Sequence, residues 1–600
     1  MITHEPSPAP GQRAAIAKGV LLAAALAVVA APLSIDPETD WLRTPIPACG
    51  ALLALLTLAS YGFLSSHGAL LRRRTGGFRL DLIDAILLLA LPLYALATSN
   101  SRLLTSGDNL ATRNLGPLIV MRRTFDLSDV SEYQENPNHY SALRVGDRLL
   151  PAFPIGTGLL SVPYAAVSLE LSGGRKTPQL LDRSEKQLAA LLFAASAVSL
   201  FLGVRRRFGE KAALGTAVVF GLATPALTTG SQGLWSTTGE TFCLSAALWC
   251  VLPGKESDVR ATAGGFAAAA AFLCRPTAVI PAAFIGLALL LTRRRAALFY
   301  GAAATAGCAA AAIFLFHLYG HPLGGYVALN PVASAWSARP IEGFLGNLVS
   351  PSRGLLVFFP YLLALPLARP ALWRNRELTC WFGVSLGTVV SLYALTSVYW
   401  KWWGGHGIGP RLMAEASPFL ALLTIPLWTE LAGRRWALTF VFATVGFAAA
   451  TQVLGLYRAE AGNWNGDAHV DQNRKALWTF RQSQILAMWW PRALAIPLEE
   501  ASIIRGRRRD DLLTGGLDTL PNGGVIHGPL VVRGWARIPG EDLETCVLLD
   551  GKERVRGPAA RYPRPDVCAV IPRMVDCTKA GFEARFEFED GDEGRHEITA

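Results

Sequence analysis

The stretch SVYWKWWGGHGIGPRLM, at residues 397–413, holds the richest group of side chains that could do chemistry. Its cations are Lys401, His406 and Arg411, and four glycines lie among them. Glycine lets backbone N–H groups come close to an anion, and cations beside such groups bind phosphate. The tryptophans of the stretch are also typical of a membrane–water interface. Anchoring alone would explain the tryptophans but not the cations, so the pattern favours an anion site.

A single carboxylate, Asp108, lies in the stretch TSNSRLLTSGDNL at residues 98–110. The Gly-Asp-Asn triplet that contains it ordinarily marks a turn, and this structural interpretation stays open. The alternative is a general base. An acid near apolar surface and near cations such as Arg102 and Arg113 can have its basicity tuned by desolvation and charge.

Other charged residues beside apolar runs have both a structural and a functional interpretation. Arg353 in SPSRGLLVFFP and Arg275 in CRPTA could bind a charged ligand. Snorkelling would equally explain Arg353, and a buried structural ion pair would explain Arg275. Asp126 and Asp129 are predicted to be structural, because nearby serines can cap a helix N-terminus.

Cysteine and motif patterns argue against several classes of site. The nine cysteines show no CxxC or Cys/His spacing, and most lie in apolar runs as small core residues. Cys546, Cys568 and Cys577 lie in the polar tail, where one disulfide and one free thiol are possible but no pairing is indicated. The chain has no P-loop, GxSxG, HExxH or dinucleotide-binding fingerprint. These patterns predict no cofactor and do not support a divalent metal, although they leave one possible.

The composition predicts that membrane helices carry these residues. The 600 residues are 51% hydrophobic and only 17% charged, which is typical of membrane proteins and not of soluble enzymes. The net charge of +11 comes largely from arginine clusters beside apolar runs, at residues 72–74, 205–207, 293–295 and 434–435. Such clusters mark cytoplasmic loops, so the positive charge does not indicate nucleic-acid binding.

About a dozen apolar runs approach the roughly 20 residues that a membrane span needs. They lie at 16–35, 45–65, 80–98, 186–204, 211–230, 233–252, 261–292 (broken at Pro276), 296–316, 354–369, 378–399, 411–431 and 436–456. With a cytoplasmic N-terminus, every arginine cluster falls inside. The first run could instead be a signal peptide. The fold class predicted is a polytopic α-helical membrane protein with about 12–14 transmembrane helices.

The same alternation places the chemically interesting loops on the outer face. Residues 99–185 form one long outer excursion, and residues 317–352 and 400–411 lie on that side too. The stretch 149–171 is apolar but rich in proline and glycine. If this stretch were a span, the arginine cluster at 205–207 would fall on the outer side. We therefore expect the stretch 149–171 to lie in the interface or to re-enter the membrane.

The tail differs in composition from the rest of the chain. A basic hinge at 501–514 precedes residues 515–600, where GPLVVRGWARI and FEARFEFE alternate as half-exposed strands do. LLDGKE supplies an Asp-Gly turn. We predict a small all-β sandwich in this region, on the extracytoplasmic side.

Several short stretches recur in an order and spacing that resemble a known family. They are SGDNLATRNLGPLIVMRRTFDLSD, AFPIGTGLLSVPYAAV, FLGVRRRFGEKAALGTAVVFGLATPALTTGSQGLW, CRPTA, YGHPLGGY, SPSRGLLVFFP, WWGGHGIGPRLMAEASPFLAL and LWTFRQSQILAM. Over residues 80–500 the chain resembles the bacterial multi-pass glycosyltransferases of the GT-C superfamily, which include aminoarabinose transferases and protein O-mannosyltransferases. Residues 1–79 then supply two additional N-terminal helices, and 515–600 resembles Ig-like domains appended to such enzymes.

The resemblance implies roles for particular residues. Asp108 matches the catalytic acid, and 151–169 matches a helix that lies along the membrane. The cations Arg353, Lys401, His406 and Arg411 match the region of donor-phosphate contacts, and Arg113 and Arg275 are additional candidates. Asn109 stands where the family has a second acid, which argues against a metal.

The implied function is an inverting glycosyltransferase of the cytoplasmic (inner) membrane. It would transfer a sugar from a polyprenyl phosphate to an extracytoplasmic acceptor, which is a cell-envelope glycan, a lipid or a protein. Two alternatives stay open. One is a non-catalytic transporter or assembly scaffold for lipid-linked glycans, and the other is a surface-polysaccharide polymerase or ligase that uses a polyprenyl diphosphate donor.

Overall fold

The computed structural model describes residues 82–493, except for short gaps at 101, 137, 253–256, 331–334, 431–434, 469 and 472, and a set of strands beyond residue 513. The predicted spans at 16–35 and 45–65 lie outside the described residues. The chain divides into two units, Met1–Ala495 and Ile496–Ala600. Each unit is considered by itself.

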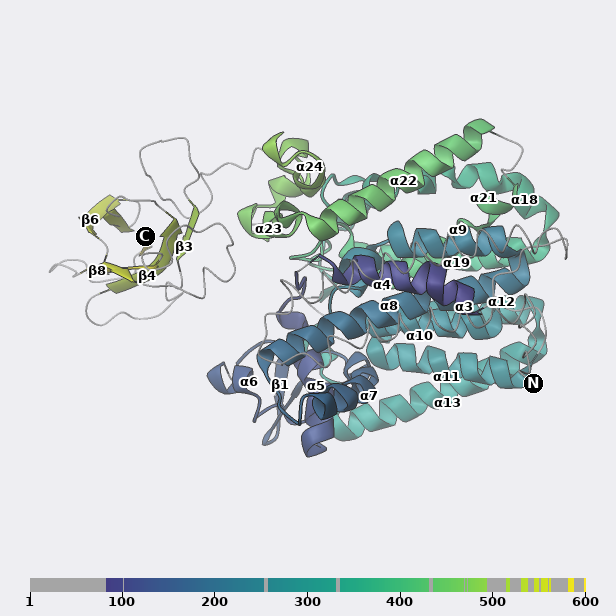
Figure 1. The fold of residues 1–600 in the computed structure, drawn as a ribbon, viewed down its shortest axis with the longest axis horizontal. Coiled ribbons are helices and arrows are strands. Elements are labelled where there is room, and N and C mark those ends of the chain that lie inside the picture. The colour runs from purple at the N-terminus through teal and green to yellow at the C-terminus, as the bar shows by residue number, and fades with distance from the viewer. Residues whose placement is uncertain are drawn as a thin grey trace, which may run out of the picture. The chain divides into compact units, whose positions relative to one another are not determined.

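The first unit is a helical bundle (Figure 1). Its longest helices are α8 (Pro178–Phe208), α13 (Arg294–Tyr319), α19 (Arg376–Val398) and α22 (Arg435–Tyr457). Shorter members are α3 (Leu82–Ala85), the π-helix η2 (Ile86–Ala90), α4 (Leu91–Thr98), α9 (Glu210–Leu222), α10 (Ser236–Val251), α11 (Asp258–Cys274) and α12 (Val279–Thr292). Alanines and glycines at the contacts let the backbones approach closely, as is common in membrane bundles. A Cβ on Gly265 of α11, for example, would lie 2.3 Å from the Tyr300 carbonyl of α13.

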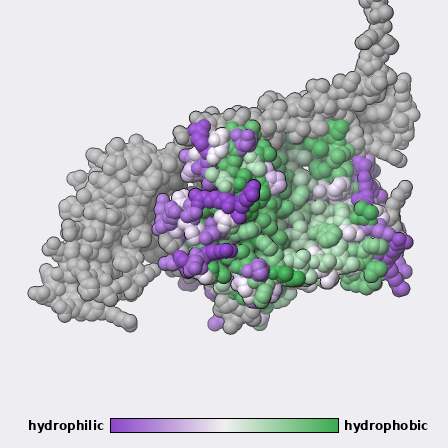
Figure 2. All heavy atoms as spheres, turned by 90° about the horizontal axis from the view of Figure 1, so that it is seen from below, coloured by the Kyte–Doolittle hydropathy of each residue, from purple (hydrophilic) through white to green (hydrophobic). Residues whose placement is uncertain are grey.

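Five helical segments of the described residues are long and apolar enough to cross a membrane. They are Pro178–Phe208, Arg294–Tyr319, Arg376–Val398, Arg411–Thr429 and Arg435–Tyr457. Figure 2 shows the matching surface, an apolar band with hydrophilic residues on both sides of it. Exposed side chains such as Leu298 and Ile313 of α13 lie in apolar helices, where lipid can cover them. These features suggest membrane association, and the sidedness stays a prediction.

Several predicted spans are not single α-helices. The run 354–369 forms only the four-residue α17 (Leu355–Phe358) and the 3-10 helix η6 (Pro360–Ala368). Prolines at 360 and 366 explain the break, because proline lacks the N–H that an α-helix needs. The run 411–431 is likewise divided into η7 (Arg411–Ala416), α20 (Ser417–Leu422) and α21 (Ile425–Glu430).

The predicted outer excursion, residues 99–185, is folded. It holds η3 (Gly107–Asn109), α5 (Leu110–Arg122), α6 (Ser131–Glu135), an antiparallel hairpin of β1 (Ala142–Val145) and β2 (Arg148–Pro151), and α7 (Gly156–Leu171). Figure 1 shows α5, α6, β1 and α7 gathered at one end of the bundle. The expected interfacial stretch is therefore a helix, α7, which is kept against α5 by close contacts such as Gly158 on Leu115.

Two local predictions in this region need correction. Helix α8 begins at Pro178, about two turns before the expected start at 186, and Thr177 caps it by accepting from the Leu180 N–H at 3.2 Å. Serines do not cap α6, since its N-cap is Val130 without a side-chain bond. Asp126 is nevertheless structural. It accepts from the backbone N–H groups of Ser128 and Leu149, both at 3.0 Å.

The remaining elements of this unit are short and connect the bundle helices. They are α14 (Tyr326–Leu329), α16 (Pro340–Val349), α18 (Arg369–Arg374), α23 (Ala459–Asp467), α24 (Gln484–Trp489), the π-helix η4 (Ala226–Gly230) and the 3-10 helices η5 (Pro276–Ala278), η9 (Arg474–Leu477), η10 (Phe480–Gln482) and η11 (Pro491–Ala493). The expected run 261–292 is interrupted at η5, so α11 and α12 are separate helices.

The second unit contains strands. They are β3 (Thr514–Leu517), β4 (Leu530–Arg537), β5 (Glu544–Leu549), β6 (Lys552–Pro558), β7 (Ala560–Tyr562), β8 (Gly581–Phe586) and β9 (Ile598–Thr599). The strand orders are β3-β4-β8-β7 and β6-β5-β9, and every pairing is antiparallel. Leu549 pairs with Lys552, the register that a two-residue Asp-Gly turn requires. The Ig-like sandwich and its extracytoplasmic location stay predictions.

Candidate functional site

The glycine-rich loop, residues 400–411, has a backbone that only glycine adopts easily. Gly404, Gly405 and Gly409 have φ values of 74°, 62° and 57°, in the left-handed region. A Cβ on Gly407 would lie 2.3 Å from the Cδ atom of Arg411. The glycines that suggested an anion site are therefore needed for the shape of the loop itself.

One amide side chain supports the loop from α24. The Oε1 atom of Gln484 accepts from the Gly409 N–H at 2.8 Å, and its Nε2 donates to the carbonyls of Gly407 and Ala461, each at 2.8 Å. Gln484 is fully buried. The sequence analysis did not identify it, because a single glutamine has no spacing pattern that would mark it.

Arg353 packs against the same loop and is 1% exposed. It makes five hydrogen bonds, to the carbonyls of Ser352, Trp403 and Gly405 and to the side-chain oxygens of Asn465 and Gln484. Its guanidinium also lies over the Trp464 ring, 5.1 Å from the centroid. An arginine has no further N–H group to offer a ligand after these contacts.

Burial is the main reason why the pKa of Arg353 falls to about 9, and the charge of Arg411 adds to it. The group still carries its charge at neutral pH, because 9 lies well above 7. The donor-phosphate contact predicted for Arg353 has no direct support in this arrangement. The geometry supports a different role, in which Arg353 fixes the loop that carries the other cations.

Asp108 lies at the start of the outer excursion, in η3. The Ser106 hydroxyl accepts from the Asp108 N–H at 3.2 Å and so caps this short helix. The Asp108 Oδ1 atom accepts from the Tyr140 hydroxyl at 2.7 Å, and Oδ2 lies 3.5 Å from Nη2 of Arg411. Burial and the negative charge of Asp108 raise the pKa of Tyr140, so its phenol stays a donor. The carboxylate itself is 24% exposed and remains accessible.

Arg411 has donors left over, unlike Arg353. Its Nε donates to the Gly404 carbonyl at 2.5 Å, and its guanidinium lies 4.9 Å from the ring centroid of Trp235. Its Nη1 atom is buried and has no hydrogen-bond partner among the described residues. A buried N–H group without an acceptor is costly, so this group is available to an oxygen atom of a ligand or of water.

Lys401 and His406 meet at a carboxylate that the sequence analysis missed. Asp471 accepts from Lys401 Nζ at 2.6 Å and from Trp403 Nε1 at 2.9 Å, and it lies 3.8 Å from His406 Nε2. Burial alone would raise the pKa of Asp471, but these donors hold it below its usual value. Burial lowers the pKa of His406 despite the nearby Asp471. In this structure Lys401 and His406 thus both face an internal carboxylate.

Two of the three tryptophans in the loop are buried, and one is exposed. Trp402 and Trp403 are 1% and 2% exposed, whereas Trp400 is 44% exposed. A Cβ on Gly346 of α16 would lie 2.2 Å from the Trp402 ring, so this ring packs directly on a helix. Of the three, only Trp400 is exposed as the predicted interfacial belt requires.

Asn109 acts as a link between elements. Its Nδ2 donates to Oε1 of Glu185 at 2.9 Å, and the Leu234 N–H donates to the same oxygen at 3.0 Å. The first turn of α5, helix α8 and the SQGLW stretch that contains Trp235 are therefore connected beside Asp108. An ionised carboxylate at 109 could not make this donation, so the contact requires the amide.

The two additional candidates are ion-paired. Arg113 contacts Asp182 at 2.6 Å and Glu132 at 3.1 Å, which ties α5 to α8 and α6. Arg275 lies 2.9 Å from Oε2 of the buried Glu415. The ion pair of Arg275 matches the structural interpretation given for it, and neither residue contacts Asp108 or the glycine-rich loop through a described hydrogen bond.

No three His, Cys, Asp or Glu side chains gather as metal ligands within the described part of the chain. Comparisons with protein-family models, curated proteins and solved structures find no match. The structure brings Asp108, Tyr140 and Arg411 together, with Lys401 and His406 on the same loop as Arg411.

Proposed function

We propose that this protein is a membrane glycosyltransferase of the GT-C type that transfers a sugar from a polyprenyl phosphate to an extracytoplasmic acceptor. The observation that carries the proposal is the pair formed by Asp108 and Arg411. A partly exposed carboxylate and a cation with a buried, unpartnered N–H group lie 3.5 Å apart across 303 residues of sequence. An acid and an anion-binding cation side by side are what this transfer requires.

In the proposed reaction the acceptor hydroxyl attacks the anomeric carbon of the donor sugar. Asp108 takes the hydroxyl proton while the new carbon–oxygen bond forms and the bond from the anomeric carbon to the phosphate oxygen breaks. The phosphate leaves with the electron pair of that bond, and the anomeric configuration is inverted. No metal or further co-reactant is needed to balance this step.

Arg411 is the residue that we assign to the leaving phosphate. Its Nη1 would donate to a phosphate oxygen as negative charge develops there, and stacking on Trp235 restricts its position. Lys401 would donate a second hydrogen bond to the donor phosphate, which would compete with Asp471 for the Lys401 ammonium group. His406 lies within the same group of charges and is 58% exposed.

Tyr140 and Arg353 support these residues without touching the reacting atoms. The Tyr140 hydroxyl donates to one oxygen of Asp108 and so restrains the position of the carboxylate. Arg353, with Gln484, maintains the loop that places Arg411. Preorganised groups of this kind lower the barrier because they need no rearrangement during the reaction.

The experiment that tests this function is mass spectrometry of the lipid-linked sugars and the cell envelope in a host strain without the gene. We expect a polyprenyl-phosphate sugar to accumulate and one envelope modification to disappear, and both to be restored by the wild-type gene. A strain without the gene that shows neither change would contradict the proposal. Purified protein that binds polyprenyl phosphate but transfers no sugar to any envelope fraction would instead indicate the transporter or scaffold.

A further inference from the structure

An open groove lies between α12 and α19, away from the candidate site. Its volume is about 600 Å³, within the range of about 300–1,000 Å³ that is typical of ligand pockets. Helix α19 begins at this groove and ends beside the glycine-rich loop, and its 23 residues span about 34 Å. The groove is therefore separate from the site described above.

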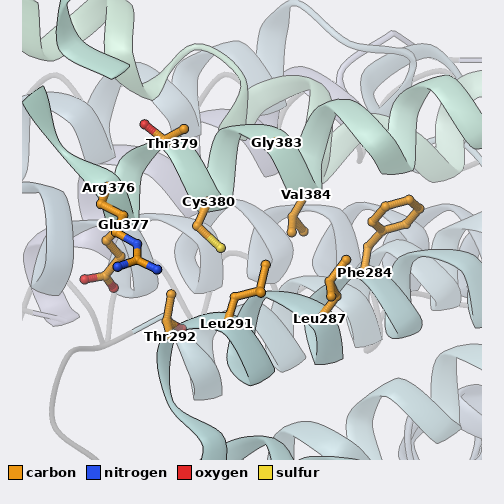
Figure 3. A pocket seen from close by; sticks show the side chains of 10 residues that line it. All are labelled: Phe284, Leu287, Leu291, Thr292, Arg376, Glu377, Thr379, Cys380, Gly383 and Val384. Atoms are coloured by element: carbon orange, nitrogen blue, oxygen red, sulfur yellow. The ribbon is translucent and has the colours of Figure 1, made fainter. Parts of the chain in front are cut away.

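The groove has an apolar half and a polar end (Figure 3). Phe284, Leu287 and Leu291 of α12 line it on one side, and Val384 and Gly383 of α19 line it on the other. Leu287 and Leu291 are 41% and 62% exposed. Such exposure of leucine is unfavourable in water, and the membrane-like composition of both helices indicates that a hydrocarbon chain covers these residues.

The polar end carries one unpaired positive charge. Glu377 is neutralised by an ion pair with Arg207. Arg376 is exposed, and the described part of the chain offers it no hydrogen bond or ion pair. The first N–H groups of α19 are already capped by the Asn375 side chain, at 3.1 Å from the Glu377 and Leu378 nitrogens. Arg376 is thus the group available to an anion at this end, with Thr292 and Thr379 nearby in the lining.

We infer that this groove binds one anionic phospholipid of the surrounding bilayer. A fatty acyl chain would lie along Leu287, Leu291 and Phe284, and the phosphate of the headgroup would bind Arg376. Basic pockets between transmembrane helices on the cytoplasmic side bind anionic headgroups in this way. The arginines at 205–207 and 293–295, at the ends of α8 and α12, place the polar end on that side by the positive-inside rule.

Gly383 allows the groove to be filled without disturbing its walls. A Cβ at Gly383 would meet no atom within 4 Å, and leucine is a better helix former than glycine. The Gly383→Leu variant should therefore fold and block the apolar half. Gly446 of α22 is the matched control, because it is also an exposed helical glycine at which a Cβ would meet no atom within 4 Å, and it does not line the groove.

The test is native mass spectrometry of the full-length protein in detergent with added phosphatidylglycerol, or with phosphatidylcholine that has the same acyl chains. We expect wild type and Gly446→Leu to retain phosphatidylglycerol in preference to phosphatidylcholine. Gly383→Leu should lose this binding. Arg376→Gln should weaken it about fivefold, the effect of one arginine near an anionic headgroup. Thermal unfolding of each variant verifies that the fold is intact.

Three results would overturn the inference. Binding by Arg376→Gln and Gly383→Leu at the wild-type level would exclude the groove. Equal retention of both phospholipids by wild type would exclude recognition of charge. Binding of polyprenyl phosphate, blocked by Gly383→Leu, without binding of phosphatidylglycerol would assign the groove to the donor lipid.

Discussion

Arg411 belongs to the glycine-rich loop and Arg353 contacts it, and the two guanidinium groups make different contacts. Arg353 is 1% exposed and makes five hydrogen bonds to the protein. Arg411 donates to one carbonyl, lies 3.5 Å from Asp108 and keeps a buried Nη1 without a described partner. Both residues are arginines, and the sequence does not distinguish their roles. The structure separates the two by the N–H groups that the fold leaves unused, and on this difference rests the proposal that Arg411 binds the donor phosphate.

The largest expected effect is the loss of folded protein in Arg353→Leu. The carbonyls and side-chain oxygens that it satisfies would be left buried and unpaired, at about 1–3 kcal/mol each. Their sum is comparable with a total stability of about 5–15 kcal/mol. Thermal unfolding in detergent and the yield of protein in membranes measure this loss.

Arg411→Leu is the matched substitution for that comparison. The substitution leaves one carbonyl, that of Gly404, without its donor, and the Arg411 side chain is 18% exposed. We therefore expect folded protein with a modestly lower Tm. Equal destabilisation by the two leucine variants would refute the distinction between the two arginines.

Arg411→Gln should reduce sugar transfer by about 10²–10³-fold, because it removes a charged donor from the leaving phosphate. Lys401→Gln is the control on the same loop, and its effect should be smaller, since Asp471 already engages Lys401. Initial rates of transfer at equal amounts of folded protein provide the measurement. A larger loss in Lys401→Gln than in Arg411→Gln would reverse the roles assigned here.

Tyr140→Phe should lower the transfer rate about tenfold, because one hydrogen bond to an ionised group is lost at a partly exposed position. The effect should fall on kcat, with the KM for the donor nearly unchanged. Tyr133→Phe makes the same chemical change at a hydroxyl that bonds to Ser141, 2.7 Å away, and should leave kcat intact. Similar kcat losses in both variants would point to a general disturbance of the outer region.

The smallest expected effect is a dependence of stability on pH through His406. Its pKa is lowered in the folded state, so the unfolded chain binds the proton more readily below pH 6.5. Stability should therefore fall slightly as the pH drops through 6.5, and His406→Gln should lack this part of the decrease. The lowered pKa of Asp471 keeps its contact with Lys401 until the pH falls below about 3.8. Tm values of both proteins at pH 8 and pH 5 test the difference.

Much of the helical architecture follows from hydropathy. Apolar runs predicted α13, α19 and α22 close to their observed bounds, because long apolar stretches have few other structures open to them. One predicted span that fails to form a continuous α-helix contains prolines. The run 354–369 has the composition of a span, but Pro360 and Pro366 prevent a continuous α-helix.

The candidate site was predictable where residue types were distinctive and close in sequence. The cations and glycines of 400–411 and the lone acid Asp108 were visible in this way. Their partners were not. Tyr140, Asp471 and Gln484 lie 32, 70 and 75 residues from the groups that they contact, and each is a common residue without a motif. Only the tertiary structure could show that Arg353 has no donor left while Arg411 does.

We propose that Asp108 is the base of the sugar transfer, and a single substitution of this residue tests that role. Asp108→Asn keeps the size of the side chain and removes the proton acceptor, which should reduce transfer by about 10²–10⁴-fold. The measurement is mass spectrometry of lipid-linked sugars and envelope products in a strain that carries this variant at wild-type protein levels. The account predicts that the variant matches the gene deletion, with the polyprenyl-phosphate sugar accumulating unused. A variant that matches wild type, while the deletion is defective, would show that residues 107–109 are only a turn.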